Sequence, residues 1–210
     1  MKQFKRALVL APHTDDGEFG AGGLISKLVE DGTKVYYVAF SICEESVPDG
    51  YHAEVLSDEV MLATAELGIS SENVFIHRFK VRLFTDSRQA ILETMIDIKK
   101  RINPDLVIMP SKFDCHQDHQ VIHNEGIRAF KDSTMLGYEI LWNNISFEAN
   151  LVVKLDEGHI NAKVRAISKY KSQSFRTFSP DMIKKLSQVR GLQIKSEFAE
   201  AYNIIRWVWE

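Results

Sequence analysis

The sequence predicts an α/β fold, in which a mostly parallel, Rossmann-like sheet carries helices on both faces within a single domain. Over the first two thirds of the chain, short apolar runs alternate with longer segments of helical periodicity. The runs are apolar almost throughout, which is typical of parallel strands buried on both faces. A chain of 210 residues has the size of one such domain, so we expect residues 1–210 to form a single unit.

The predicted elements follow from this alternation. Strands of the alternating part are expected at residues 6–11, 34–42, 73–77 and 105–109. Helices are expected at residues 18–30, 53–67, 87–102 and 119–130. The first three of these helices meet stop signals, which are Asp31-Gly32, Gly68 and Asn103-Pro104. Beyond Gly137 the pattern predicts strands at 138–142 and 151–155, then helices at 160–173 and 180–188.

Composition excludes several classes of protein. The chain has 26 basic and 29 acidic residues, and a net charge of −3 gives it no electrostatic attraction to nucleic acid. Cys43 and Cys115 do not form a Cys-x-x-Cys pair, which argues against a disulfide scaffold and a zinc finger. The apolar runs are shorter than the roughly 18 residues of a transmembrane segment, and the first has no signal-peptide cleavage site. We therefore expect a cytoplasmic protein.

Unusual polar residues follow two of the predicted strands. His13, Asp15 and Asp16 come directly after the strand at 6–11, and His116, Asp118 and His119 come after the strand at 105–109. In an open α/β sheet these strands are neighbours at the switch point, and ligands bind at their carboxyl ends. The two loops are therefore expected to face each other across one crevice.

The residue types in these loops suit a catalytic metal. His13 and Asp16 can point the same way from a turn that enters a helix, and one histidine of the second loop would complete a set of two imidazoles and a carboxylate. Such a set leaves positions open for water, whose pKa the metal lowers toward about 7. Taken alone, an Asp-Asp pair after a strand is more often a helix cap. Two such clusters on adjoining strands favour the metal site.

The paired motifs Pro12-His13-Thr14-Asp15-Asp16 and His116-Gln117-Asp118-His119 resemble the signatures of the PIG-L/LmbE-like deacetylases. Members of that family are zinc-dependent hydrolases that remove the acetyl group from N-acetylglucosamine-type sugars. The resemblance extends over most of the chain and reaches Tyr170-Lys171-Ser172-Gln173 near its end. Thr14 and Gln117 stand where proline is commoner, at positions that are not ligands.

The resemblance implies a role for each motif residue. It makes His13, Asp16 and His119 the ligands of one Zn²⁺ per chain, although another divalent transition metal would suit the same donors. Asp15 would be the general base. His116, when protonated, would stabilise the oxyanion and donate to the leaving amine, with Asp118 orienting it. The implied substrate is a small N-acetylated amino sugar or sugar conjugate, and the implied assembly is a homo-oligomer, since relatives often associate.

Three further residues are candidates for substrate binding. Glu44 follows the strand at 34–42 and could contact sugar hydroxyls. Arg82 ends a segment in which basic and apolar residues alternate, which indicates either a solvated face or a clamp for an anionic group of the substrate. Arg88 could contact substrate or form a salt bridge on a helix surface.

Other functions fit the sequence less well. The glycines after the first strand do not complete Gly-x-Gly-x-x-Gly, because Ile25 stands at the third position, which argues against a nicotinamide enzyme. A non-haem iron oxygenase also uses two histidines and a carboxylate, but such sites usually lie in β-rich barrels. A metal-binding sugar-recognition protein without turnover is a further alternative. It would have no need of Asp15 or His116.

Overall fold

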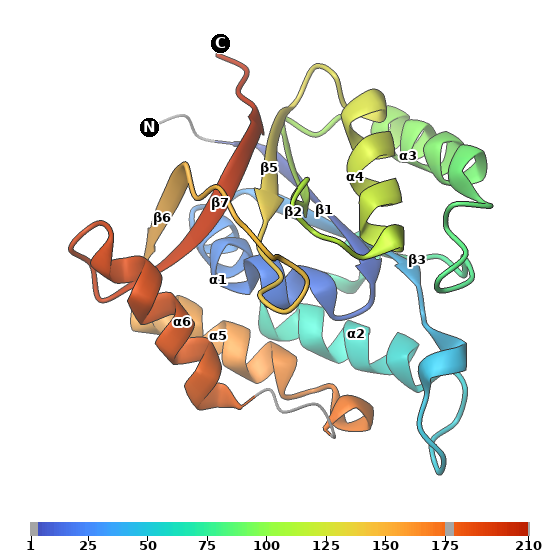
Figure 1. Cartoon of the computed structure of the whole chain (residues 1–210), viewed down its shortest axis with the longest axis horizontal. Coiled ribbons are helices and arrows are strands. Elements are labelled where there is room, and N and C mark those ends of the chain that lie inside the picture. The colour runs from blue at the N-terminus through green and yellow to red at the C-terminus, as the bar shows by residue number, and fades with distance from the viewer. Residues whose placement is uncertain (1–3, 175–178, 210) are drawn as a thin grey trace.

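The computed structural model describes residues 4–174 and 179–209, and its centre is a sheet of seven strands in the order β3-β2-β1-β4-β5-β7-β6 (Figure 1). The five strands from β3 to β5 pair in parallel, and β7 runs antiparallel to both of its neighbours. Their bounds are β1 Arg6–His13, β2 Lys34–Ser41, β3 Val74–Ile76, β4 Leu106–Pro110, β5 Thr134–Tyr138, β6 Leu151–Leu155 and β7 Phe198–Arg206.

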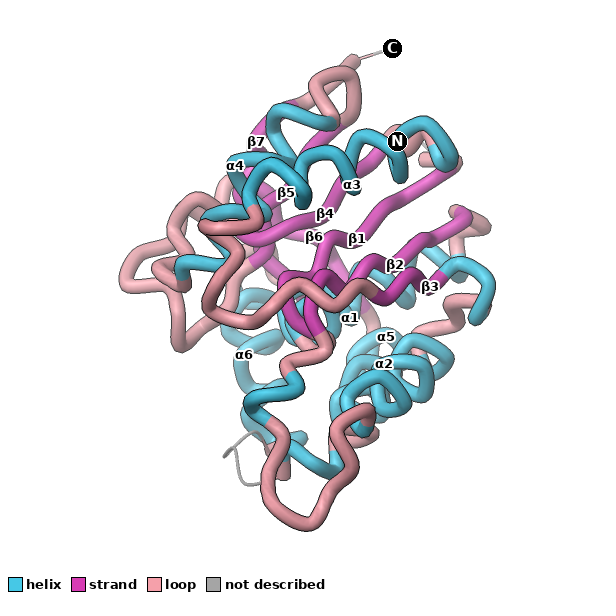
Figure 2. Tube along the Cα trace, turned by 90° about the vertical axis from the view of Figure 1, so that its right-hand side faces the viewer, coloured by secondary structure: helices cyan, strands magenta, loops and turns pink. Residues whose placement is uncertain are grey.

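Helices cover both faces of the sheet (Figure 2). Their bounds are α1 Asp16–Glu30, α2 Val55–Glu66, α3 Arg88–Ile102, α4 Gln117–Ala129, α5 Glu157–Ile167 and α6 Pro180–Leu192. Helices α3 and α4 pack on one face, while α1, α2 and α5 pack on the other. This arrangement confirms the predicted α/β class and the Rossmann-like, mostly parallel sheet. In the described part of the chain, no helix combines the length and apolar character needed to span a bilayer.

The structure corrects two expectations for the last third of the chain. The strand expected at 138–142 lies earlier, at Thr134–Tyr138, because after Tyr138 the chain leaves the sheet in a turn held by a hydrogen bond from Ile140 N to Asn144 Oδ1. The helix expected at 160–173 ends at Ile167, and a single 3₁₀ turn covers Lys171–Gln173.

The sequence analysis missed strand β7. Its pattern is obscured because Glu200 and Asn203 are buried on it among apolar residues. The Glu200 carboxylate accepts hydrogen bonds from Gly23 N at 2.9 Å and Leu24 N at 2.7 Å, and it also pairs with Lys163. A buried carboxylate is tolerated when its oxygens are satisfied in this way. Glu200 therefore fastens the last strand to the middle of α1.

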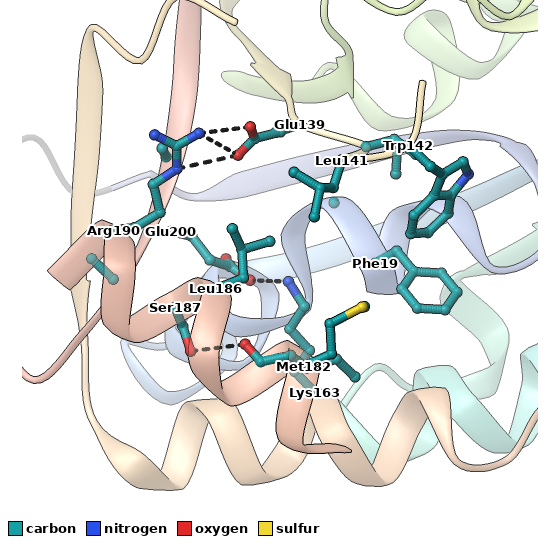
Figure 3. Close-up of a pocket in the computed structure, with 15 residues that line it drawn as sticks. Phe19, Glu139, Leu141, Trp142, Lys163, Met182, Leu186, Ser187, Arg190 and Glu200 are labelled. Carbon is teal, nitrogen blue, oxygen red and sulfur yellow. Dashed lines mark hydrogen bonds and ion pairs between the residues drawn. The ribbon is translucent and has the colours of Figure 1, made fainter. Parts of the chain in front are cut away.

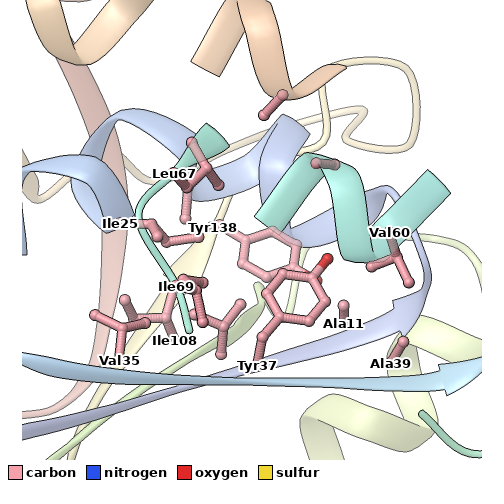
Figure 4. Packing of buried hydrophobic residues seen from close by; sticks show 14 of the residues in the cluster. Ala11, Ile25, Val35, Tyr37, Ala39, Val60, Leu67, Ile69, Ile108 and Tyr138 are labelled. Atoms are coloured by element: carbon pink, nitrogen blue, oxygen red, sulfur yellow. The ribbon is translucent and has the colours of Figure 1, made fainter. Parts of the chain in front are cut away.

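The apolar core lies on both sides of the sheet. Figure 4 shows the cluster on the α1 side. On the α1 side, Tyr37 and Tyr138 are fully buried, and their rings fill the space between the strands and the helix. Helix α1 lies close to these rings because it has glycines where it faces them. A Cβ atom on Gly20 would come within 2.3 Å of Tyr138 Cδ2, and one on Gly17 within 2.5 Å of Tyr37 Cε2.

We expect Gly20→Ala to lower the free energy of unfolding by about 1–3 kcal/mol, because the Tyr138 ring has no room to move. Urea denaturation measures this change. Gly158→Ala is the control, since a Cβ on Gly158, also in a helix, meets only Asp156 Oδ1 at 3.1 Å. Alanine's better helix propensity acts at both positions. Equal effects of the two substitutions would contradict the close packing of α1 on Tyr138.

Candidate metal centre and active site

The two polar loops meet because β1 and β4 are parallel neighbours, with Val9 paired to Ile108. Each strand ends at the same edge of the sheet, and a helix begins directly after each loop. His13 is the last residue of β1, and Asp16 begins α1. His116 is the N-cap of α4, and His119 lies in its first turn. The sequence prediction that the loops share one crevice is therefore confirmed.

Three donor atoms from the two loops form a compact triangle. Asp16 Oδ2 lies 3.2 Å from His13 Nδ1 and 3.2 Å from His119 Nε2, and the two imidazole nitrogens are 3.3 Å apart. Ligands about 2.0–2.1 Å from a tetrahedral zinc ion are separated by about 3.3–3.4 Å. The donor types and their spacing therefore fit a divalent transition metal without rearrangement.

A second carboxylate fixes each of these imidazoles from its far side. Asp118 Oδ2 is 3.0 Å from His13 Nε2, and Asp114 Oδ2 is 2.7 Å from His119 Nδ1. Both carboxylates are buried, so these contacts set the tautomer and direct His13 Nδ1 and His119 Nε2 toward Asp16. Histidines that bind metals are commonly oriented in this way. The sequence analysis gave Asp114 no role, although an acidic residue next to the second histidine motif was an available signal.

The carboxylate of Asp118 contacts a different histidine from the one that the resemblance implies. This carboxylate contacts His13, and it also accepts hydrogen bonds from Arg82 N at 2.6 Å and Phe84 N at 3.3 Å. The main chain of Asp118 orients His116 instead, because Asp118 N donates to His116 Nδ1 at 3.2 Å. The first turn of α4 directs the side chain of Asp118 away from the N-cap, toward β1, which explains the difference.

The electrostatics of the triangle favour a bound cation. Burial by itself raises the pKa of Asp16, but His119 and His13 outweigh it and hold this pKa well below its usual value. Burial lowers the pKa of His119, yet the carboxylates of Asp16 and Asp114 outweigh it and raise the pKa to about 10. A site that binds a proton this tightly has an excess of negative charge around His119. A metal ion that displaces the proton would satisfy the same carboxylates.

His116 has its Nε2 atom available as a donor. Since Nδ1 accepts the hydrogen bond from Asp118 N, the proton of the neutral ring resides on Nε2. Burial, together with the nearby His119 and His13, lowers the pKa of His116 to about 4. Asp118 opposes this shift as a lesser cause. This pKa favours the neutral ring near pH 7, and the role that the resemblance implies for the protonated form stays a prediction. Geometrically His116 can also join His13 and His119 in a group of metal-binding size.

Asp15 lies between the triangle and a buried hydrogen-bonding network. The carbonyl of the preceding residue, Thr14, accepts hydrogen bonds from Tyr37 Oη at 2.9 Å and Tyr170 Oη at 2.6 Å. Both hydroxyls also contact the carboxyl of Glu18, whose pKa burial raises to about 8. Asp15 is itself buried, and it lines the pocket beside the triangle. The loop that carries it is therefore held by residues from β2 and from the segment after α5.

The triangle opens into a pocket of about 350 Å³, which is large enough for a small molecule. The predicted residues His13, Asp15, Asp16, His116 and His119 all line it. Further lining residues, most of which the sequence analysis did not single out, are Thr14, Cys43, Ser46, Leu56, Val81, Trp142, Asn143 and Gln173. They come from loops distant in sequence, which explains why local motifs did not reveal them.

Of the three candidate substrate contacts, the structure places only Arg82 on this pocket. Glu44 lies on a neighbouring depression and pairs with Arg78, Oε1 to Nη1 at 2.6 Å. Arg88 forms an ion pair of 2.8 Å with the buried Glu125 on α4. Neither Glu44 nor Arg88 is among the residues that line this pocket, and their substrate-binding assignments stay predictions. The ion pair of Arg88 agrees with the other expectation for this residue, a salt bridge on a helix surface.

Figure 3 shows a second pocket, between α6 and the loop that precedes β6. Its charged residues are paired with each other, Lys163 with Glu200 and Arg190 with Glu139. Its volume of about 40 Å³ is far below that of a typical ligand site. Trp142 lines both pockets, on the wall between them. The chemistry therefore belongs to the larger pocket.

Known proteins resemble the chain in sequence and in fold. Diacetylchitobiose deacetylase of Thermococcus kodakarensis is 26% identical over 214 residues, which cover 98% of this chain and 73% of the relative. The N,N'-diacetylchitobiose deacetylase of Pyrococcus horikoshii has a similar structure, with a TM-score of 0.78, 20% identity, and coverage of 96% of this chain and 84% of that one.

The same fold also carries a different reaction. GalB, the 4-carboxy-2-hydroxymuconate hydratase of Pseudomonas putida KT2440, has a TM-score of 0.75 at 18% identity, and 98% of each chain is covered. The fold alone therefore does not determine the activity.

Membership of a family is established by sequence, since residues 8–130, more than half of the chain, match the family described as PIG-L: GlcNAc-PI de-N-acetylase. The chain belongs to the PIG-L family of metal-dependent de-N-acetylases.

Proposed function

We propose that this protein is a zinc-dependent N-deacetylase that hydrolyses the acetamido group of an N-acetylated amino sugar or sugar conjugate. The observation that carries the proposal is the triangle of His13, Asp16 and His119 with Asp15 and His116 on the same pocket. A binding protein would need the triangle alone. The two further titratable side chains supply what hydrolysis needs, a base and a hydrogen-bond donor.

We assign His13 Nδ1, Asp16 Oδ2 and His119 Nε2 as the protein ligands of the metal. Asp118 and Asp114 then act as the carboxylates that orient the two imidazoles. When bound, the zinc ion supplies Lewis acidity, which makes a water molecule more acidic and polarises a carbonyl. Zinc is preferred because two imidazoles and one carboxylate form a common catalytic set for this ion.

Asp15 and His116 divide the proton chemistry between them. The Asp15 carboxylate accepts a proton from the attacking water as its oxygen bonds to the acetyl carbon. His116 Nε2–H, directed by the hydrogen bond at Nδ1, donates to the carbonyl oxygen as negative charge develops there. When the C–N bond breaks, Asp15 returns the proton to the leaving nitrogen, so that a primary amine and acetate are released. A neutral His116 can fill its role without being protonated.

The direct test of this proposal is acetate release. The zinc-loaded protein is incubated with N-acetylglucosamine and with N,N'-diacetylchitobiose, and acetate and primary amine are both quantified. We expect the two products in equal amounts, and we expect a chelator to abolish their release. Absence of both products for every N-acetylated sugar, from protein that holds its metal, would contradict the proposal.

Three expectations from the sequence accompany this function as proposals. The native metal is zinc, the chain associates as a homo-oligomer, and residues 1–210 act as one cytoplasmic unit. Metal analysis of the purified protein, sedimentation and cell fractionation test them respectively.

Asp15→Asn is expected to reduce kcat by about 10²–10⁴-fold, because the amide cannot accept the proton of the attacking water. Metal content should stay at the wild-type level, since Asp15 contributes no atom to the triangle. Asp97→Asn is the matched control. Asp97 is an exposed residue of α3 that pairs with Lys100, so its loss should leave turnover unchanged. Near-normal turnover of Asp15→Asn would remove Asp15 from the role of base.

Asp118→Asn is expected to weaken zinc affinity by about 10–100-fold, because the carboxylate that orients His13 is lost. Competition with a chelator of known affinity measures the change. Asp105→Asn serves as the control, since the Asp105 carboxylate also accepts main-chain hydrogen bonds, from Lys5 N and Arg6 N, away from the metal site. If Asp118→Asn bound zinc as tightly as the wild type, Asp118 would not contribute to metal binding. Its role would then be limited to accepting the main-chain hydrogen bonds of Arg82 and Phe84.

A further inference from the structure

Arg82 is fixed to the metal centre through its main chain. Its N–H donates to Asp118 Oδ2 at 2.6 Å, and the same carboxylate oxygen contacts His13 Nε2 at 3.0 Å. The residue has a φ of 67°, in the left-handed region that side chains other than glycine seldom adopt. Unfavourable backbone conformations of this kind cluster at functional sites. The position of Arg82 relative to the metal site is therefore set by the protein.

Among the residues that the structure describes, no carboxylate neutralises the charge of Arg82, in contrast to its neighbours on the same segment. Arg78 pairs with Glu44 and Glu54, and Lys80 Nζ lies 3.6 Å from Glu45 Oε1. Across residues 4–174 and 179–209, no carboxylate pairs with the Arg82 guanidinium, although the side chain is exposed beside the pocket. Asp118, the acidic residue in contact with it, accepts the main-chain N–H instead.

Arg82 is also the sole arginine or lysine among the described residues that line the pocket. The other titratable side chains that the proposed mechanism uses there are Asp15, Asp16 and three histidines. A guanidinium offers a planar fork of donors that matches a carboxylate or a phosphate. A group of that kind on the substrate is what the wall of this pocket could recognise.

We propose that Arg82 is a specificity-determining residue that binds an anionic group, a carboxylate or a phosphate, on the N-acetylated sugar. The inference rests on the proposed function and narrows it, since the preferred substrates are then acidic amino sugars or conjugates. Neutral N-acetylated sugars lack this contact and bind the same pocket more weakly. Arg82 acts in binding, and the hydrolytic groups are the same for both kinds of substrate.

The test is a comparison of binding constants, measured by titration calorimetry on zinc-loaded protein that carries Asp15→Asn, so that binding is not accompanied by rapid turnover. The Arg82 and Arg78 variants are made in this same protein. The ligands are N-acetylglucosamine, its 1-phosphate, its 6-phosphate and its carboxymethyl glycoside. We expect at least one anionic ligand to bind about tenfold or more tightly than the neutral sugar, as a hydrogen bond to a charged group implies. The anionic ligand that gains most distinguishes phosphate from carboxylate.

Arg82→Gln should remove this preference, so that the anionic ligand binds no more tightly than neutral N-acetylglucosamine. Glutamine keeps a long polar side chain and carries a similar backbone cost at positive φ, so the Asp118 contact can persist. Arg78→Gln is the matched control, because Arg78 is already paired and is not among the pocket residues. Its ratio of neutral to anionic Kd should equal that of the protein in which Arg78 is intact.

Two results would overturn the inference, namely equal affinities for neutral and anionic sugars while Arg82 is present, or a preference that survives in Arg82→Gln. The second would assign the anion to the metal itself. Acetate release, measured in parallel on protein in which Asp15 is intact, separates this inference from the proposed function. Acetate without an anionic preference rejects Arg82 alone, whereas an Arg82-dependent preference without acetate retains the binding site and rejects the deacetylase.

Discussion

The Asp16 carboxylate lies between two imidazoles from different loops, and most of the surrounding structure maintains that contact. Asp16 Oδ2 is 3.2 Å from a ring nitrogen of both His13 and His119, and the carboxylates of Asp118 and Asp114 hold the far nitrogens. Three carboxylates around two imidazoles leave an excess of negative charge in a buried place. Such a group is costly without a cation. The excess negative charge of the whole group, rather than any single residue, makes this a site for a cation.

The fold assembles this cation site by bringing distant segments to one edge of the sheet. Parallel pairing of β1 with β4 brings the two loops together, and the first turns of α1 and α4 direct their side chains inward. Tyr37 and Tyr170 then hold the Thr14 carbonyl, so that a strand and the segment after α5 both position the loop of Asp15. Rigid support of this kind keeps reacting groups in place.

Sequence reasoning was most successful where a local pattern determines structure. The alternation of apolar runs and helices predicted the parallel part of the sheet, and the carboxyl ends of β1 and β4 predicted where His13, Asp16 and His119 converge. It failed where partners are distant in sequence. Strand β7 was missed because the partners that satisfy the buried Glu200 carboxylate come from α1 and from Lys163 of α5, far away in the sequence. The contact of the Asp118 carboxylate with His13 was not foreseen, because it depends on the neighbouring strand. The ion pair of Glu44 with Arg78 was likewise not foreseen, because Arg78 comes from another loop.

The central claim is that His13, Asp16 and His119 form one metal site, and metal stoichiometry tests it most directly. Zinc content and affinity are compared for the wild type, His119→Ala and His123→Ala. His123 is a buried histidine of the same helix, whose Nδ1 bonds the Pro110 carbonyl at 2.8 Å. We expect one tightly bound zinc per chain in the wild type and in His123→Ala, and loss of this zinc in His119→Ala. Folded wild-type protein without tightly bound metal, or undiminished binding in His119→Ala, would contradict the account.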